Sequence, residues 1–201
     1  DVYKRQFIDP NDRLEENLKT DILFVCSGLN VMSKVDRSLL GILRKLARRG
    51  IKLGSLCTAS YLLAKAGLLT NRKTTIHWEN SLSMKEEFPE LEVTNNLFEI
   101  DRDRYSCSGG TSSLDLMLNI IIENHGSNLA KSVSDQLIHE RIRYSSDYQR
   151  MSLRSRLGVS HPKLLSSVSI MEENLEEPLS HKELSKKANI SLRQLERLFN
   201  K

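Results

Sequence analysis

The chain has 201 residues, of which 39% are hydrophobic and 28% are charged, and its formal net charge at pH 7 is +4. This length and apolar content suffice for one medium-sized globular domain and a second, small one. No apolar run approaches the roughly 20 residues that cross a bilayer, and no leader with a cleavage site is visible. We therefore expect a cytoplasmic protein that makes no membrane contact.

The cysteines argue against a disulfide framework and against a bound metal. They occur at positions 26, 57 and 107, an odd number without paired spacing. Disulfide-rich domains and zinc clusters use closely spaced sets of cysteines, so we expect neither, and no cofactor is predicted. Residues 1–6 match nothing that follows, and we interpret them as a cloning or assembly scar.

The first part of the chain alternates between predicted strands and helices. Residues 21–28 are a continuous apolar run that ends in Ser-Gly, typical of a strand buried on both faces of a parallel sheet. Residues 36–49 place leucines on one side of a helix and basic residues on the other, and Gly50 follows. A strand over 51–57 and a helix over 58–67 complete a strand–helix–strand–helix unit.

The alternation continues through the middle of the chain, with shorter elements than before. These predicted elements are a strand over 74–77, a helix over 79–87, a strand pair over 97–101 and 105–107, and helices over 111–124 and 127–139. Strands that alternate with helices in this way favour an α/β domain, which we assign to residues 1–140.

Cys57 lies where the second predicted strand ends and a helix begins. At this nucleophile-elbow position we expect the helix dipole and free backbone amides to lower the pKa of the thiol and to offer an anion site. His77 ends the next predicted strand, so in a parallel sheet its ring could overhang the same edge. An inert buried cysteine and a structural histidine are the alternatives, and the residues alone leave them open.

Two short helices joined by a tight turn are predicted near the end of the chain. Ser180 is followed three residues later by Glu183, and Ser191 by Gln194, which is the pattern of two capping boxes. The residues expected to face inward are Leu184, Ala188, Ile190, Leu195, Leu198 and Phe199. A preceding amphipathic helix that starts at 160–162 supplies the third member of a core. Its apolar stripe is predicted to hold Leu164, Val168, Met171 and Leu175.

The outer face of the second of these short helices is polar. Arg193, Gln194 and Arg197 are side-chain types that bind base edges or phosphates in a major groove. Residues 141–201 carry a net charge of +5 and residues 1–140 one of −1, so the basic charge is concentrated at this end. The alternative is a helical hairpin whose outer face is only solvated. We assign residues 141–160 to a linker and 161–201 to this helical domain.

Both parts resemble known families. The pattern LSKKANISLRQLERLFNK is similar to the first helix-turn-helix of AraC-type transcription regulators, which carry two such units. The motifs GSLCTASYLLAKAGLL, TTIHWE and CSGGTSSLDLMLNII resemble the ThiJ/PfpI-like domain of GlxA-type AraC regulators. The resemblance implies a three-layer flavodoxin-like α/β sheet (class I glutamine-amidotransferase-like) followed by a small all-α domain. On this basis we expect the sheet to be truncated at its N-terminal edge and only the first helix-turn-helix to be present.

The resemblance also assigns roles to residues. It makes Cys57 the elbow cysteine and His77 the pocket histidine, both regarded as vestigial. The implied ligand-binding residues are Gly28, Cys57, Thr58, His77, Trp78, Glu79 and Gly110, and the implied DNA-binding residues are Ser191, Arg193, Gln194 and Arg197. The His-Trp-Glu form is similar to the subgroup that controls catabolism of arginine, carnitine and glycine betaine. It indicates an amino acid or quaternary amine, with Trp78 offering a ring face and Glu79 a counter-charge.

Two departures from the family pattern argue against catalysis. Thr58 stands where the PfpI enzymes have a histidine, and the segment that supplies their acidic residue does not occur in this chain. We therefore predict a homodimeric, sequence-specific DNA-binding regulator that senses a small metabolite through a non-catalytic domain. A cysteine hydrolase or amidase, with Cys57 as nucleophile and His77 as base, is one alternative. A module that binds protein in place of DNA is the other.

Overall fold

The computed structural model describes residues 13–150 and 153–200, so the predicted scar at 1–6 lies outside the described residues. The chain divides into two compact units, residues 1–149 and residues 150–201. Among the described residues, no helix is both long and apolar enough to cross a membrane.

The larger sheet of the first unit has the strand order β1-β2-β6-β5. β1 and β6 both run parallel to β2, and β5 is an antiparallel edge strand formed by a hairpin with β6. Ser27 pairs with Cys57, so β1 and β2 end side by side. The predicted strands in these positions are confirmed. Their bounds are β1 (Ile22–Ser27), β2 (Lys52–Cys57), β5 (Phe98–Asp101) and β6 (Arg104–Cys107).

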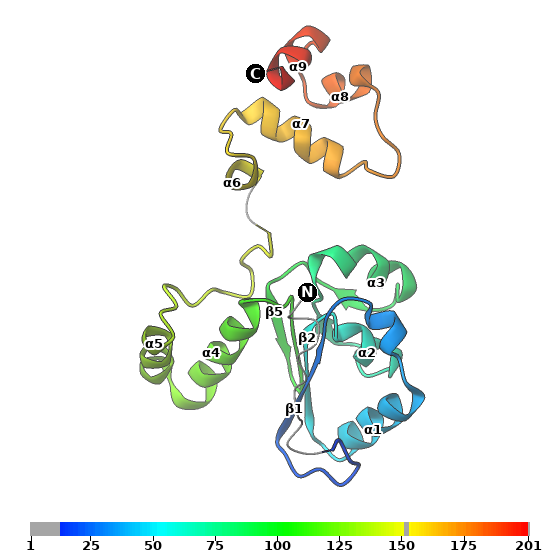
Figure 1. The fold of residues 1–201 in the computed structure, drawn as a ribbon, viewed down its shortest axis with the longest axis vertical. Helices are drawn as coiled ribbons and strands as arrows, with labels where there is room; N and C mark the ends of the chain where they lie inside the picture. Colours follow the sequence, from blue (N-terminus) through cyan, green and yellow to red (C-terminus); the bar gives the residue numbers. More distant parts are fainter. Residues whose placement is uncertain (1–12, 151–152, 201) are drawn as a thin grey trace, which may run out of the picture. The chain divides into compact units, whose positions relative to one another are not determined.

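Helices cover both faces of this sheet, which makes the three-layer arrangement predicted from the sequence (Figure 1). The core on one face is built with α1 and α2, and the core on the other with α4. The flavodoxin-like α/β class is thus confirmed. The helices of this unit are η2 (Val31–Lys34), α1 (Arg37–Arg48), α2 (Ser60–Lys65), η3 (Trp78–Asn80), α3 (Ser81–Glu87), α4 (Ser112–His125) and α5 (Ser127–Gln136).

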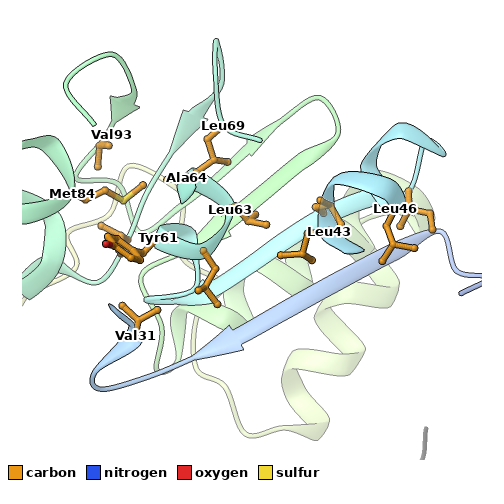
Figure 2. Packing of buried hydrophobic residues seen from close by; sticks show 13 residues of the cluster. Val31, Leu43, Leu46, Tyr61, Leu63, Ala64, Leu69, Met84 and Val93 are labelled. Atoms are coloured by element: carbon orange, nitrogen blue, oxygen red, sulfur yellow. The ribbon is translucent and has the colours of Figure 1, made fainter. Parts of the chain in front are cut away.

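Leucines of α1 and α2 contribute a large part of the first core. The helical period places those of α1 on one side of the helix, whereas α2 is buried over the consecutive residues 60–64. Leu43, Leu46 and Leu63 are fully buried and pack with Leu53 of β2 (Figure 2). Burial of one such side chain contributes about 1.5–3 kcal/mol, so this cluster fixes both helices against the sheet.

The second core lies on the opposite face, under α4. Its buried members are Leu97, Phe98, Tyr105, Cys107, Leu116 and Ile120. Phe24 of β1 also packs here and lies across Gly54 of β2. A Cβ at position 54 would come within 2.2 Å of the Phe24 ring, so only glycine leaves room for the ring.

The strand predicted over 74–77 forms only in part. β3 covers Lys73–Thr74 and pairs in parallel with β4 (Glu92–Val93), a short strand that was not predicted, in a separate small sheet. The backbone leaves the strand at Thr75 because the amide of that residue donates to the side-chain hydroxyl of Ser106 in β6, at 2.9 Å, and not to a backbone carbonyl.

The helix predicted over 127–139 ends at Gln136, three residues early. Ile138 has φ of 55°, a left-handed conformation that a continuing helix does not allow. The amide of His139 then donates to the Ser134 carbonyl at 2.9 Å. This turn releases His139 from the helix and lets its ring reach the protein interior.

The second unit is built from short helices, and both predicted capping boxes are present. Ser180 Oγ accepts from the Glu183 amide (3.4 Å) while the Glu183 carboxylate accepts from the Ser180 amide (2.9 Å). Ser191 and Gln194 repeat the arrangement at 3.2 and 2.9 Å. The helices are α6 (Leu153–Leu157), α7 (Pro162–Glu172), α8 (His181–Lys187) and α9 (Leu192–Phe199).

The core of the second unit follows the predicted pattern except at its ends. Leu184, Ala188 and Leu195 are buried as predicted. Three residues expected to face inward are exposed: Met171 (43%), Leu175 (74%) and Phe199 (48%). Leu175 misses the stripe because α7 ends at Glu172, while Met171 and Phe199 lie in the last turns of their helices.

Candidate functional site

The candidate site forms where β1 and β2 end, around the predicted elbow at Cys57. Cys57 has φ of 63°, a conformation that is uncommon for a residue with a side chain and that costs free energy. The chain turns there from β2 into α2, with two residues between. The elbow geometry predicted from the sequence is therefore present, and it places the thiol at the carboxyl edge of the sheet.

Gly109 makes this elbow sterically possible. It has φ of 92°, and a Cβ at this position would lie 2.6 Å from Cβ and 2.8 Å from Sγ of Cys57. The sequence prediction instead singled out Gly110, which faces open space. The adjacent pair of glycines marked the right turn, but only the fold distinguishes which of the two lies against the thiol.

Thr58 ties the elbow to the loop that follows β1. Its hydroxyl donates to the carbonyl of Gly28 at 2.7 Å. The side chain is buried, so this hydrogen bond holds the two loops at a fixed spacing beside Cys57. Thr58 and Gly28 thus shape the wall of the site together.

His77 does not end a strand but caps the short helix η3. Its Nδ1 accepts from the Glu79 amide (3.4 Å) and lies 3.8 Å from a carboxylate oxygen of Glu79. Nδ1 is occupied by this contact, which leaves Nε2 as the ring nitrogen for an outside partner. The ring is 30% exposed and therefore accessible to a small molecule.

A cavity of about 370 Å³ joins these residues. Five of the seven predicted ligand-binding residues line it: Gly28, Cys57, Thr58, His77 and Glu79. Trp78 and Gly110 are not among its lining residues, although the Trp78 ring lies 5.5 Å from that of His77. Sequence reasoning missed Leu29, Asn30 and Asn80, because these lining residues belong to no motif.

The pKa of the Cys57 thiol is shifted in the direction opposite to the one expected. Burial raises the pKa above its ordinary value, and this effect outweighs the hydrogen bond from the Thr58 backbone, which acts to lower it. Negative charge on the nearby Cys107 and Glu79 would disfavour a thiolate further. The elbow therefore favours a neutral thiol, because burial outweighs the one backbone hydrogen bond that lowers the pKa of Cys57.

A chain of buried hydroxyl groups lies behind the elbow. Ser55 Oγ and Ser60 Oγ are 2.8 Å apart, and Ser60 donates to the carbonyl of Thr75 at 2.6 Å. The side-chain amide of Gln149 donates to the Thr75 hydroxyl at 2.9 Å. These contacts connect the segment that carries His77 to β2 and to the end of the first unit.

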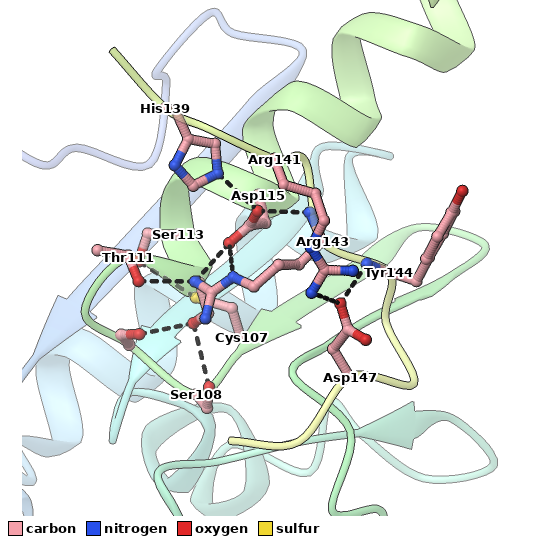
Figure 3. A network of polar contacts seen from close by, with 12 residues as sticks. Cys107, Ser108, Thr111, Ser113, Asp115, His139, Arg141, Arg143, Tyr144 and Asp147 are labelled. Atoms are coloured by element: carbon pink, nitrogen blue, oxygen red, sulfur yellow. Dashed lines mark hydrogen bonds and ion pairs between the residues drawn. The ribbon is translucent and has the colours of Figure 1, made fainter. Parts of the chain in front are cut away.

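A second polar cluster surrounds Asp115 on the α4 side of the sheet (Figure 3). Its buried carboxylate accepts from His139 Nε2 (3.0 Å) and from the backbone amide and Nε of Arg143 (both 2.8 Å). Burial acts to raise the pKa of Asp115, but the Arg143 and His139 hydrogen bonds hold it below its usual range. None of these residues lines the cavity, and we interpret the cluster as a structural tie.

The residues predicted to contact DNA lie together on α9. Arg193, Gln194 and Arg197 are exposed on this helix. The side-chain oxygen of Gln194 accepts from the Ser191 amide at 2.9 Å, which leaves the amide nitrogen of Gln194 for an outside partner. Ser191 itself acts as the N-cap of the helix. Gln194 and Arg197 also line a hollow of about 120 Å³ with His161 and Lys163.

No group of three or more histidine, cysteine or acidic side chains is placed to hold a metal ion in the part of the chain that the structure describes.

Comparison with protein families gives a match to the DJ-1/PfpI family over residues 8–123, more than half of the chain. The chain belongs to the DJ-1/PfpI family. The match covers the elbow, the cavity and most of α4, and it ends well before α6–α9. The DJ-1/PfpI fold therefore accounts for the first unit, and its turn after β2 supplies the Cys57 elbow.

The relatives extend the likeness over both units. The HTH-type transcriptional regulator GbdR of Pseudomonas aeruginosa is 42% identical over 194 residues, which are 96% of this chain and 53% of GbdR. CdhR of the same species, also named an HTH-type transcriptional regulator, is 44% identical over 192 residues, 96% of this chain and 57% of CdhR. The chain thus spans about half the length of the curated relatives it matches.

A solved structure supports the same fold. The crystal structure of an AraC family transcriptional regulator from Pseudomonas putida is 32% identical and superposes with a TM-score of 0.54. The superposition covers 61% of this chain and 64% of that protein. This likeness agrees with the resemblance predicted from the elbow, pocket and glycine motifs.

Proposed function

We propose that this chain belongs to a transcription regulator, in which the DJ-1/PfpI unit binds a small effector and the C-terminal helices bind DNA. The observation that carries the proposal is the 42–44% identity, across 96% of the chain and hence both units, to proteins named HTH-type transcriptional regulators. A relative that shared only the first unit would support the fold but not this function.

The geometry of α9 supports the DNA-binding half of the proposal. Arg193 and Arg197 lie one helical turn apart and exposed, so they can reach phosphates or guanine edges from one face. The capping boxes fix the residues at which α8 and α9 begin, and this helps to hold α9 in a defined orientation on α8. Ser191 is the N-cap of α9, and the N-terminus of a helix is a favourable place for a phosphate to bind.

The cavity supports the sensing half and indicates a class of effector. Of the described residues that line it, Glu79 is the only acid and none is lysine or arginine. Hydrogen-bond donors are available from Cys57, from His77 and from two asparagine amides. A small zwitterion, with a cationic amine near Glu79 and a carboxylate near the donors, suits this lining. Trp78, whose ring lies 5.5 Å from that of His77, could add a ring face for a quaternary amine.

The same geometry supports binding in preference to hydrolysis. A nucleophilic cysteine needs a thiolate and an oriented base, but burial raises the pKa of Cys57 and the Nδ1 of His77 is occupied by the Glu79 amide. Thr58, which follows Cys57, is bonded to Gly28 and brings no acid–base group. The hydrolase alternative would require turnover that depends on Cys57.

Two further statements complete the proposal. Helix-turn-helix regulators gain specificity by binding paired half-sites as dimers, so we propose a homodimer. Because the DNA of a bacterial cell lies in its cytoplasm, we propose that compartment as the place of action.

The sensing half is tested by thermal denaturation of the chain with arginine, carnitine or glycine betaine, while NMR follows the amount of each compound. We expect one of them to stabilise the protein saturably and to remain intact, since a ligand at 100 times its Kd adds about 2.7 kcal/mol. Glu79→Gln should weaken this effect and Glu90→Gln, an exposed acid outside the cavity, should not. Consumption of a compound that stops in Cys57→Ser would establish the enzyme instead.

The DNA-binding half is tested by selection of duplexes from a random library, followed by affinity measurements at several salt concentrations. We expect an enriched sequence whose affinity falls steeply with salt and falls further in Arg193→Ala and Arg197→Ala. Arg48→Ala, which removes an exposed charge from α1, is the matched control. Equal losses in all three variants, or no enriched sequence, would contradict the assignment of α9.

A further inference from the structure

The segment of residues 139–149, here called the strap, joins α5 to the first residue of the second unit and is bonded along its length. At its start, Arg143 and His139 bind the buried carboxylate of Asp115, and Arg143 also donates to the Thr111 hydroxyl at 2.6 Å (Figure 3). At its middle, the Ser145 carbonyl accepts from the Leu97 amide at 2.7 Å. The strap is therefore a fixed part of the first unit and not a loose tether.

The end of the strap reaches the buried hydroxyl chain behind the candidate site. Gln149 Nε2 donates to Thr75 Oγ1 (2.9 Å) and to the carbonyl of Asn96 (2.8 Å). Its own side-chain oxygen is buried and has no hydrogen-bond partner. An unsatisfied buried oxygen costs free energy, so the contact persists because the two donated bonds outweigh that cost.

Thr75 is the point at which this contact meets the site. Its carbonyl accepts from Ser60, three residues after Cys57, and its amide is held by Ser106. Two residues further on, His77 and then Glu79 line the cavity. A shift of Thr75 would therefore move the cavity wall that faces the elbow.

We propose that Gln149 is a positioning residue for the effector cavity: by holding Thr75 it sets the place of His77 and Glu79 over Cys57, and it links the state of the cavity to the strap. The inference deepens the proposed ligand-binding role of the cavity and rests on it. The linkage is reciprocal. If the Gln149 contact changes the affinity of the cavity for a ligand, a bound ligand must change the stability of the Gln149 contact by the same factor.

The side-chain amide of Gln149 has partners for its nitrogen but not for its oxygen, and this suits such a link. Two donated bonds and one orphaned oxygen leave a small net stabilisation, so occupants of modest affinity can shift the contact. Gln149 is also the last residue of the first unit, so its release would free the end of the strap.

The test uses the rate at which iodoacetamide alkylates Cys57, measured in the full chain with Cys26→Ser to remove the exposed thiol. Gln149→Met keeps the shape of the side chain and removes both donors. We expect it to raise the alkylation rate roughly fivefold, the factor that corresponds to one hydrogen bond of about 1 kcal/mol. Tyr148→Ser is the matched control, because that neighbouring side chain is 88% exposed.

The pH profile separates positioning from simple loosening. The groups that act on Cys57 are Glu79 and Cys107, with His77 in the same cavity. If Gln149→Met moves Glu79 away, the thiolate forms more easily and the profile shifts to lower pH, and this shift should be absent when Glu79→Gln is already present. General loosening, which reduces the burial of the thiol, would shift the profile with or without Glu79. A profile and rate equal to those of Tyr148→Ser would overturn the proposal.

A second pair of variants covers the case in which Gln149→Met fails to fold. Thr75→Val removes the hydroxyl that accepts from Gln149 and itself donates to the Asn96 carbonyl (2.7 Å). Thr75→Ser keeps both bonds, so only the first variant should reproduce the effect. In the reverse direction, alkylation of Cys57 should speed hydrogen exchange of the Leu97 amide, which is bonded to the strap. Unchanged exchange would contradict the linkage. Since these measurements need neither DNA nor an effector, their failure is distinct from failure of the proposed function.

Discussion

Asp115 is a charge held inside the protein, and its environment determines how it responds to substitution and to pH. The carboxylate is fully buried and is paired with Arg143 and His139. We predict that Asp115→Asn destabilises the chain by roughly 3 kcal/mol, because it leaves the Arg143 guanidinium without its counter-charge. Urea denaturation at pH 7 measures the difference.

The pH dependence of this difference follows from the depressed pKa of Asp115. A carboxyl group whose folded pKa lies below the unfolded value of about 3.9 stabilises the protein fully above that value and loses its contribution as pH falls through the folded pKa. The gap between the native chain and Asp115→Asn should therefore narrow below about pH 4. A gap that stays constant down to pH 2 would show that the ionised form is not what stabilises the fold.

Gly109 and Gly110 offer a matched pair at the same scale. Both have positive φ, but only Gly109 lies against Cys57. We predict that Gly110→Ala costs about 1 kcal/mol, from backbone conformation alone, and that Gly109→Ala costs at least about 2 kcal/mol more because the added carbon overlaps the thiol. Denaturant midpoints compare the two, and equal losses would mean that the elbow can move aside.

The sequence predicted where the elbow of this site lies, but not the direction in which the pKa of its thiol is shifted. The turn from an apolar strand into a helix is a local pattern, so the elbow at Cys57 was predictable. The raised pKa of its thiol was not, because it depends on burial and on Glu79 and Cys107, which come from distant parts of the chain. Gly110 was chosen over Gly109 for the same reason, since the close approach exists only in three dimensions.

At the scale of elements, Phe24 of β1 is paired with Gly54 of β2, and its ring fills the space beside the glycine. A Cβ at position 54 would overlap the Phe24 ring. We predict that Gly54→Ala destabilises the chain by about 1–3 kcal/mol through overpacking. Gly41→Ala, in the middle of α1 with nothing within 4 Å, should instead stabilise it by about 0.5–1 kcal/mol, because alanine favours the helix.

Thermal or urea denaturation of the two alanine variants checks both signs. A loss of stability in each would show that the space beside Gly41 is needed, and a neutral Gly54→Ala would show that the Phe24 ring can turn away. The same variants also separate strand packing from helix propensity, since the chemical change is identical.

Helices and strands with a clear period of apolar residues were predictable. Elements whose ends are set by side-chain hydrogen bonds were not. α1 has leucines at helical spacing and lies where predicted. The segment 74–77 has the composition of a strand, yet the Ser106 hydroxyl takes the Thr75 amide and ends β3 early. β4 is two residues long and gives no periodic signal. The last turn of α5 was overextended because nothing in the sequence marks the left-handed Ile138.

For the whole molecule, alternation of strands and helices predicted the α/β class, and the family resemblance implied its three layers. The connection between the units was predicted from composition alone. Residues 141–149 are polar and were assigned to a linker, whereas the structure bonds them to Asp115, Leu97 and Thr75. A polar segment that satisfies buried groups looks like a linker in sequence, since its partners are more than twenty residues away. The compact units meet at residues 149 and 150.

Two compact units should unfold separately, and the position of the only tryptophan makes this measurable. Trp78 lies in the first unit, so its fluorescence reports that unit, whereas far-ultraviolet circular dichroism reports helices in both. Leu195→Ala removes a buried side chain from the core of the second unit and should cost that unit about 2–5 kcal/mol. We predict an earlier loss of part of the helical signal with an unchanged Trp78 transition. If the fluorescence midpoint falls together with the helical signal, the two units unfold in one cooperative transition, and the prediction of separate unfolding is wrong.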